Sequence, residues 1–177
     1  MSVIKVEDSR AAFGLGQRRV TERDAWPLIA ASFKPQHFLL LASHPAGAPY
    51  VRTAADAGHL AHLAANPSFS AFCGERVLAC GGLLPWWNGS ASAWIAVAAD
   101  IGASRMLELH HIVRRLLDSR PERRISADVL TIAQNGHRWA RALGFVNEGR
   151  MRSYTPEGLD AELYARVRQK PLQGAMH

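Results

Sequence analysis

The stretch Trp139-Ala140-Arg141-Ala142-Leu143-Gly144-Phe145-Val146-Asn147-Glu148-Gly149 joins a short helical pattern to a strand pattern through a glycine. The apolar residues of its helical half are spaced so that they share one face of a helix. Gly144 stands where helices often end in a residue with positive φ, a conformation that glycine adopts at little cost. Side chains then alternate over residues 145–154, which predicts a strand.

Further elements alternate in type around this stretch. We expect strands at 69–73, 76–84, 93–98, 125–132 and 161–167, and helices at 56–65 and 106–119. Residues 20–31 read as the entry to another helix, and 44–49 as a loop. Pro85 is expected to end its strand, and Gly81-Gly82 indicates a bulge or a close backbone approach. Helices between strands predict an α/β layer built on a mixed sheet.

The composition limits the class of protein. With 177 residues, 48% of them hydrophobic, the chain can form one domain over 1–177, although residues 1–50 are the least readable. A net charge of +6 favours contact with polyanions without choosing among them. Cys73 and Cys80 lie in apolar strand patterns, which is typical of reduced, buried thiols. Because neither a secretory leader nor a run long enough to cross a bilayer is evident, we expect a cytoplasmic protein with no membrane partner.

The order of elements over residues 69–167, with Leu-Gly-Phe-x-x-Glu-Gly at 143–149, resembles the GCN5-related N-acetyltransferase (GNAT) fold. Within it, Gly81-Gly82-Leu83-Leu84-Pro85-x-Trp87 followed by Ala93-Trp94 is similar to a phage-borne group. The resemblance implies an acetyltransferase that moves an acetyl group from acetyl-CoA to an amine acceptor by direct attack. It also leaves open an alternative: a catalytically degenerate virion or assembly protein with phage structural partners, made in a bacterium or a phage-infected cell.

The resemblance places the acyl-CoA site at the loop and helix start over residues 97–105, where backbone amides would cradle a pyrophosphate. The family pattern of Gln or Arg, two residues, Gly, one residue, Gly or Ala is met here by Ala99, Gly102 and Ser104. Asp100 is electrostatically unfavourable there unless it points away. An ordinary turn capped by Ser104 explains the same residues. The predicted cofactor-binding residues are Val97, Ala99, Gly102, Ala103, Ser104, Arg105 and Asn135.

The position that often holds a catalytic tyrosine in the family is Ala140 in this chain. His137 and Tyr154 are therefore the predicted catalytic residues, with Tyr164 as a further candidate acid. A solvated helix histidine and a tyrosine packed on the sheet are the structural alternatives. The candidate bases are Asp128 and Glu148, either of which could instead pair with an arginine.

Three other groups of residues carry weaker indications. Trp86-Trp87 could line an acceptor pocket, cap a hairpin or form a contact surface. His110-His111 lacks further ligands, so no metal site is expected. The basic group around the long helix reads as a solvated face rather than a nucleic-acid site, because no interleaved aromatic residues accompany it; it comprises Arg114, Arg115, Arg120, Arg123 and Arg124. The identity of the acceptor and the formation of a homodimer stay open.

Overall fold

The computed structural model describes residues 27–43 and 57–168, and the expected loop at 44–49 lies outside them. Seven strands form one mixed sheet in the order β1-β2-β3-β4-β5-β7-β6. In chain order the elements are β1 (Leu28–Ser32), α1 (Pro35–Ser43), α2 (Ala57–Ala64), β2 (Ser68–Cys73), β3 (Arg76–Trp87), β4 (Ser90–Val97), α3 (Ala103–Ser119), β5 (Arg124–Leu130), α4 (Gln134–Ala142), β6 (Val146–Met151) and β7 (Ala161–Val167). The expected mixed α/β architecture is confirmed.

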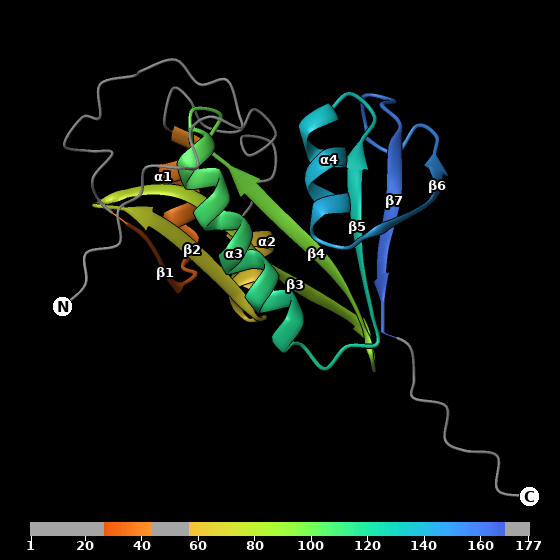
Figure 1. Ribbon diagram of the computed structural model, residues 1–177, viewed down its shortest axis with the longest axis horizontal. Coiled ribbons are helices and arrows are strands. Elements are labelled where there is room, and N and C mark those ends of the chain that lie inside the picture. The colour runs from red at the N-terminus through yellow and green to blue at the C-terminus, as the bar shows by residue number, and fades with distance from the viewer. Residues whose placement is uncertain (1–26, 44–56, 169–177) are drawn as a thin grey trace, which may run out of the picture.

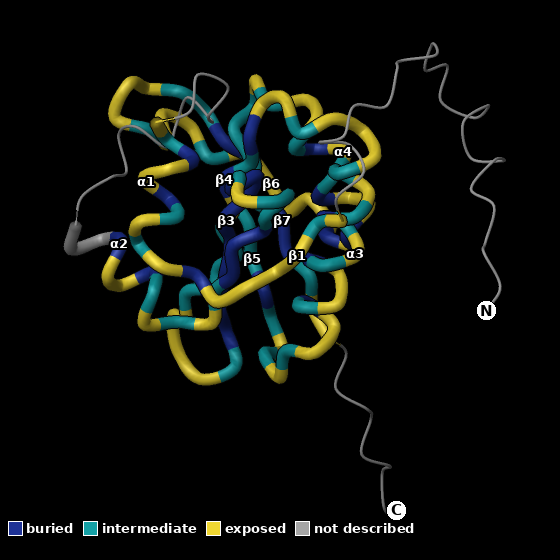
Figure 2. Tube along the Cα trace, turned by 90° about the vertical axis from the view of Figure 1, so that its left-hand side faces the viewer, coloured by how far each residue is buried: buried dark blue, intermediate teal, exposed yellow. Residues whose placement is uncertain are grey.

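The helices cover the sheet on both faces, in two layers (Figure 1). On one face, α3 buries Leu109, Val113 and Leu117 against the sheet, and α4 adds Ala140 to the same cluster. On the other face, α1 and α2 pack on strands β3 and β4 through a second apolar cluster. Figure 2 shows the buried segments gathered along the central strands. The two clusters fix which side chains of each strand face which layer.

Strands β4 and β5 are neighbours over only part of their length. Their parallel pairing covers three residue pairs, from Ser90 with Arg124 to Ser92 with Ser126. Beyond these pairs β4 runs on to Val97 and β5 to Leu130, and the two strands diverge (Figure 1). All other neighbouring strands are antiparallel. The sheet is therefore split between β4 and β5 toward the ends from which α3 and α4 begin.

Several local predictions are confirmed, with small changes of boundary. Gly144 has a φ of 88° and ends α4 as expected. The strand at 161–167 has the expected bounds, while α3 begins three residues before the expected Met106. The backbone approaches closely at Gly82, where an added Cβ would lie 2.6 Å from the Pro67 carbonyl oxygen. No bulge lies at Gly81-Gly82 in the pairing of β2 with β3. The register shift between these two strands lies at Ala71 and Phe72 of β2.

Two predictions of local structure are wrong. Residues 28–31 were expected in a helix, but they form β1, an edge strand paired with β2. The pairing and a hydrogen bond of 2.7 Å from the Leu28 amide to the Glu108 carboxylate override the local helical preference. Pro85 does not end β3, which continues to Trp87 through an irregularity between Pro85 and Trp87. Proline is tolerated where the ladder is already irregular.

Neither Cys73 nor Cys80, both within the described residues, takes part in a disulfide, as the sequence predicts. Cys80 lies in the second cluster, within 3.5 Å of the Ser70 hydroxyl. Burial raises the pKa of its thiol to about 11. The thiol therefore stays protonated at neutral pH and behaves as a small apolar side chain.

Candidate active site

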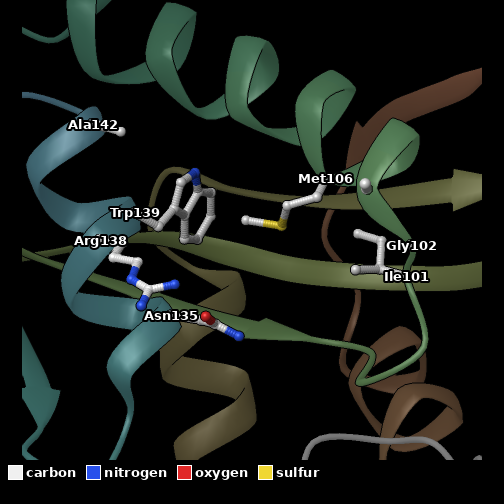
Figure 3. Close-up of a pocket in the computed structure, with 8 residues that line it drawn as sticks. Ile101, Gly102, Met106, Asn135, Arg138, Trp139 and Ala142 are labelled. Atoms are coloured by element: carbon white, nitrogen blue, oxygen red, sulfur yellow. The ribbon is translucent and has the colours of Figure 1, made fainter. Parts of the chain in front are cut away.

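A pocket of about 480 Å³ opens between the start of α3 and the face of α4. It lies toward the end of the sheet where β4 and β5 diverge, and strands pass behind it in Figure 3, but none of the described residues that line it belongs to a strand. Its lining comes from the loop before α3, the first turn of α3 and α4: Ile101, Gly102, Ala103, Met106, Asn135, Arg138, Trp139 and Ala142. The pocket is mainly apolar inside, with one guanidinium and one carboxamide among its side chains.

The α4 wall of this pocket carries its polar groups. Figure 3 shows Arg138 and Asn135 together on one side and the Trp139 indole reaching toward Met106 of α3. The indole Nε1 of Trp139 is buried and has no hydrogen-bond partner. An unpaired buried donor is uncommon in folded proteins, and because this nitrogen is shielded from the open space, Trp139 presents its apolar ring to the pocket. From the sequence, Trp139 was assigned to the apolar face of α4 that packs in the core. It was therefore not predicted to line the pocket.

The α3 wall is formed by a helix start. Gly102 precedes the helix with a φ of 75°, and Met106 donates the first helical bond to the Gly102 carbonyl at 3.0 Å. Amides in the first turn of a helix point out along its axis and attract anions. Ser104 is an exposed residue of this turn and makes no capping hydrogen bond, so its expected role as the cap is wrong. The cap position belongs to Gly102.

Two charged residues near the helix start are already engaged. The Asp100 carboxylate accepts a hydrogen bond of 2.6 Å from the Arg76 guanidinium of β3. This ion pair neutralises the charge that the sequence marked as unfavourable for an anion. Arg105 donates to Glu108, one turn further along α3. Its side chain is therefore directed along the helix.

The seven predicted cofactor-binding residues thus separate into two groups. Gly102, Ala103 and Asn135 line the pocket together. Val97 is half-buried at the end of β4, Ala99 is exposed in the following loop, and Ser104 and Arg105 lie in the first turn of α3, outside the lining. Sequence reasoning missed Met106, Arg138 and Trp139, although all three lie in helices whose positions it predicted.

His137 faces the sheet from α4 and is only 6% exposed. Its Nδ1 lies 3.1 Å from the hydroxyl of Tyr164, a fully buried residue of β7. The same hydroxyl donates to the Glu162 carboxylate at 3.2 Å. The alternative of a solvated helix histidine is therefore wrong, and His137 belongs to a buried polar network that fixes α4 on β7. Neither His137 nor Tyr164 lines the pocket.

Tyr154 and Asp128 form a pair on the opposite face of the sheet. The Tyr154 hydroxyl donates to the Asp128 carboxylate at 2.6 Å, and both residues are exposed. Burial, followed by the bond to Asp128 and the charge of that carboxylate, raises the pKa of Tyr154 to about 12. The phenol is therefore fully protonated at neutral pH, with its proton directed at a carboxylate.

The strand register places Asp128 beside the split. Ser126, the last residue of β5 paired with β4, is two residues before it on the same face. That face is opposite to the one where Ile125 packs against α3. Glu148, the other candidate base, forms a two-point ion pair with Arg124, which lowers the pKa of its carboxyl. Of the two candidate bases, Asp128 is thus the one that lies on the part of β5 that is not paired with β4.

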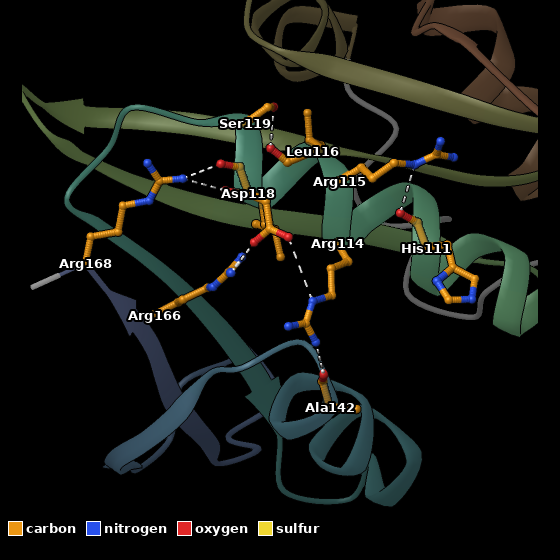
Figure 4. A network of polar contacts seen from close by, with 10 residues as sticks. His111, Arg114, Arg115, Leu116, Asp118, Ser119, Ala142, Arg166 and Arg168 are labelled. Carbon is orange, nitrogen blue, oxygen red and sulfur yellow. Dashed lines mark hydrogen bonds and ion pairs between the residues drawn. The ribbon is translucent and has the colours of Figure 1, made fainter.

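The basic group around α3 is joined in a network of carbonyl and carboxylate contacts (Figure 4). Asp118 binds Arg166 and lies 3.8 Å from Arg114, and the Arg166 guanidinium holds the pKa of this carboxyl below its usual value. Arg168 donates to the Leu117 and Asp118 carbonyls at the end of the helix. Such contacts stabilise a helix C-terminus and need no nucleic-acid partner.

Comparisons with known proteins give likenesses of structure alone. The sequence matches none of the protein-family models compared, and none of the curated proteins. The ribosomal-protein-S18-alanine N-acetyltransferase from Escherichia coli is similar with a TM-score of 0.62 at 16% identity, over 84% of this chain and 99% of that one. An N-acetyltransferase from Staphylococcus aureus Mu50 gives 0.60 at 13% identity, over 79% and 98%.

An acetyltransferase of the GNAT family from Bacillus anthracis gives a TM-score of 0.56 at 10% identity, over 79% of this chain and 94% of that one. Together with the split between β4 and β5, these likenesses define the class: the chain has the GNAT fold, as its sequence predicts. No helix among residues 27–43 and 57–168 is long and apolar enough to span a bilayer.

Proposed function

We propose that this protein is an acetyl-CoA-dependent N-acetyltransferase that transfers the acetyl group to an amine by direct attack. The observation that carries the proposal is the parting of β4 from β5 after Ser92 and Ser126, together with a pocket between the start of α3 and α4, the helices that begin at the diverging ends of these strands. A gap in a sheet exposes strand backbone that can bind an extended chain bearing amides, and a helix start beside it suits a phosphate. The proposal includes a cytoplasmic location.

The residues present fit acetyl-CoA in two respects. The first turn of α3 offers amides for the pyrophosphate, and Asp100 does not oppose it because Arg76 neutralises its charge. Arg138 offers a guanidinium that can hold a phosphate oxygen at the rim of the pocket.

Asp128 and Tyr154 supply the proton transfers. As the amine nitrogen bonds to the thioester carbonyl carbon and the carbon–sulfur bond breaks, the Asp128 carboxylate takes the proton that nitrogen must lose. Tyr154 gives its phenolic proton to the departing thiolate. The proton then passes from Asp128 to Tyr154 along their 2.6 Å hydrogen bond, which restores both groups. This route does not need the catalytic tyrosine that the GNAT family often has at the position of Ala140.

Calorimetric titration with acetyl-CoA tests the proposal directly. We expect saturable binding to one site and an upward shift of the thermal unfolding midpoint, because a ligand that binds only the folded state stabilises it. Release of CoA thiol in the presence of a panel of primary amines then tests transfer. Absence of heat and of thermal stabilisation at millimolar acetyl-CoA would remove the enzymatic proposal.

A virion or assembly role is the second candidate. It is favoured by Ala99 and Ala140, where residues typical of the chemistry are replaced, and by the burial of Ala140 in the core. This candidate expects the protein to copurify with phage particles and to show no turnover with any amine. Turnover above the uncatalysed rate that is lost on removal of Asp128 would rule it out as the sole function.

A further inference from the structure

A second pocket lies on the face of the sheet that carries Asp128. It is a shallow, open hollow of about 210 Å³ at the base of the split, where β4 and β5 are still paired. Its lining comes from the tip of the β3-β4 hairpin and from β5 and β7: Trp86, Trp87, Ser90, Arg124, Ser126 and Leu163. Sites for drug-sized ligands are larger, so this volume suits a single small group.

Two adjacent tryptophans face this one pocket because the strand is irregular where they lie. Successive side chains of a regular strand point to opposite faces, which would separate Trp86 from Trp87. The register shift between Pro85 and Trp87 removes that alternation. Their rings lie 6.2 Å apart at 59°, and the residues are 66% and 69% exposed. Two adjacent large apolar side chains that are exposed to water around one hollow are typical of a binding surface.

The hairpin tip is tied to the start of β5, so the pocket is already formed. The amides of Arg123 and Arg124 both donate to the Gly89 carbonyl, at 2.9 and 3.1 Å. A Cβ at Gly89 would lie 3.1 Å from the Arg123 Nε, so the guanidinium packs directly over the turn. A preformed pocket loses little conformational entropy when a ligand enters.

The pocket is electrically balanced. Among the described residues that line it, Arg124 alone is ionised, and Glu148 binds that guanidinium at two points, one of them at 2.9 Å. A carboxylate on the ligand would have to compete with Glu148 for Arg124. A ligand that carries an ammonium group besides the reacting amine would place that group close to the Arg124 guanidinium, which would repel it. Exposed indole faces and a neutralised charge therefore favour an uncharged, flat, apolar group.

The strand register connects this pocket to the proton-transfer pair. Ser126 lines the pocket, and Asp128 is two residues further along the same face of β5. Leu163 lines the pocket and is the β7 residue directly opposite Asp128. The near end of the pocket, at Ser126, is therefore about 7 Å from Asp128, a separation that a chain of about two or three carbon atoms between a nitrogen and a ring can bridge. Trp87 is level with Ser90 and Arg124 at the far end of the pocket, so its indole would contact the outer edge of such a ring.

We propose that the pocket of Trp86 and Trp87 is the acceptor subsite of this enzyme, and that it takes the aromatic ring of a small primary arylalkylamine whose nitrogen lies at Asp128. The inference rests on the proposed acetyl transfer, which it deepens by naming the acceptor class. Trp86 and Trp87 act here as specificity-determining residues and take no part in proton transfer.

The test compares two primary amines on the full chain, with acetyl-CoA saturating and with each rate expressed per concentration of the unprotonated amine. We expect kcat/KM for 2-phenylethylamine to exceed that for propylamine by at least about tenfold, because the ring adds aromatic contacts. Trp87→Ala should remove most of this preference by raising KM, while kcat/KM for propylamine stays within about twofold. Leu107→Ala is the matched control, since Leu107 is an exposed apolar residue of α3, 58% exposed and outside both pockets.

Ser126→Leu provides a second variant, which fills the pocket in place of emptying it. It should lower kcat/KM for 2-phenylethylamine by a larger factor than kcat/KM for propylamine. Equal turnover of both amines by the wild-type protein, or a preference for 1,4-diaminobutane, would overturn the assignment. So would a Trp87→Ala variant that keeps the preference. These outcomes are distinct from failure of the proposed function, in which acetyl-CoA neither binds nor is consumed.

Discussion

Replacement of Asp128 by Asn is the most informative single perturbation of this protein. Asn keeps the size of the side chain and an oxygen that can accept the Tyr154 hydrogen bond, now 2.6 Å long, but it removes the negative charge. Two consequences follow, one for the pKa of Tyr154 and one for turnover. The first can be measured without any substrate.

The pKa of Tyr154 should fall in this variant. The Asp128 carboxylate stabilises the protonated phenol by accepting its hydrogen bond, and its charge opposes the phenolate, so both effects raise the pKa. Their loss moves the value down from about 12 toward the ordinary 10.0. It should not reach 10.0, because burial is the largest cause of the shift and remains in the variant. Absorbance of the phenolate near 295 nm against pH measures the change, with Tyr154→Phe identifying the contribution of this residue.

Turnover should fall by about 10²–10⁴-fold, the range expected when a positioned general base is removed. The fall should appear in kcat more than in KM, because Asp128 acts on the reacting nitrogen and does not hold the ring. Glu75→Gln is the matched control, since Glu75 is an exposed carboxylate of the turn between β2 and β3 and lines neither pocket. A rate for Asp128→Asn within about threefold of the wild-type rate, with an unchanged pH profile, would refute the assignment of Asp128 as the base.

Three further predictions concern the other wall of the site and the framework. Arg138→Ala should weaken acetyl-CoA binding about tenfold in calorimetry, as expected for one charge-assisted contact, whereas Arg115→Ala, an equal change of charge on α3, should not. Gly82→Ala should destabilise the fold by about 1–3 kcal/mol in urea denaturation, because the new methyl would meet the Pro67 carbonyl at 2.6 Å; Gly136→Ala, where the nearest atom is a Val129 methyl at 2.9 Å, should cost less. Tyr164→Phe should cost about 1–3 kcal/mol, because it leaves His137 buried without the hydroxyl 3.1 Å away; a loss no larger than that of Tyr154→Phe would contradict this account of the buried network.

The sequence predicted most of the architecture because its strongest signals are local. The glycine stop at Gly144, the helix at 106–119 and the strand at 161–167 each follow from the periodicity and breakers of a short window. The order of these elements then predicted a mixed sheet covered by helices, and the GNAT fold. Residues 28–31 were mispredicted because their strand exists only by pairing with β2, which lies some forty residues further along the chain.

The site was only partly predictable, for the same physical reason. Sequence reasoning proposed Gly102, Ala103 and Asn135 at the acyl-carrier site and Asp128 and Tyr154 among the acid–base candidates. It had no means to see that Trp139 turns toward Met106 across a pocket, or that His137 is buried against Tyr164. Which side of a helix faces a cavity depends on the neighbouring helix, and periodicity does not report that.

By itself, then, the sequence determined the kinds of elements, their order and the glycine that ends α4, because these depend on backbone preferences and on apolar spacing along the chain. Only the tertiary structure decided where β4 leaves β5, that Asp100 is neutralised by Arg76, and that Asp128 shares a face with Trp86 and Trp87. Each of these facts joins residues from different strands, and their distances are set by strand register and twist. The chemistry proposed for this protein depends on those distances.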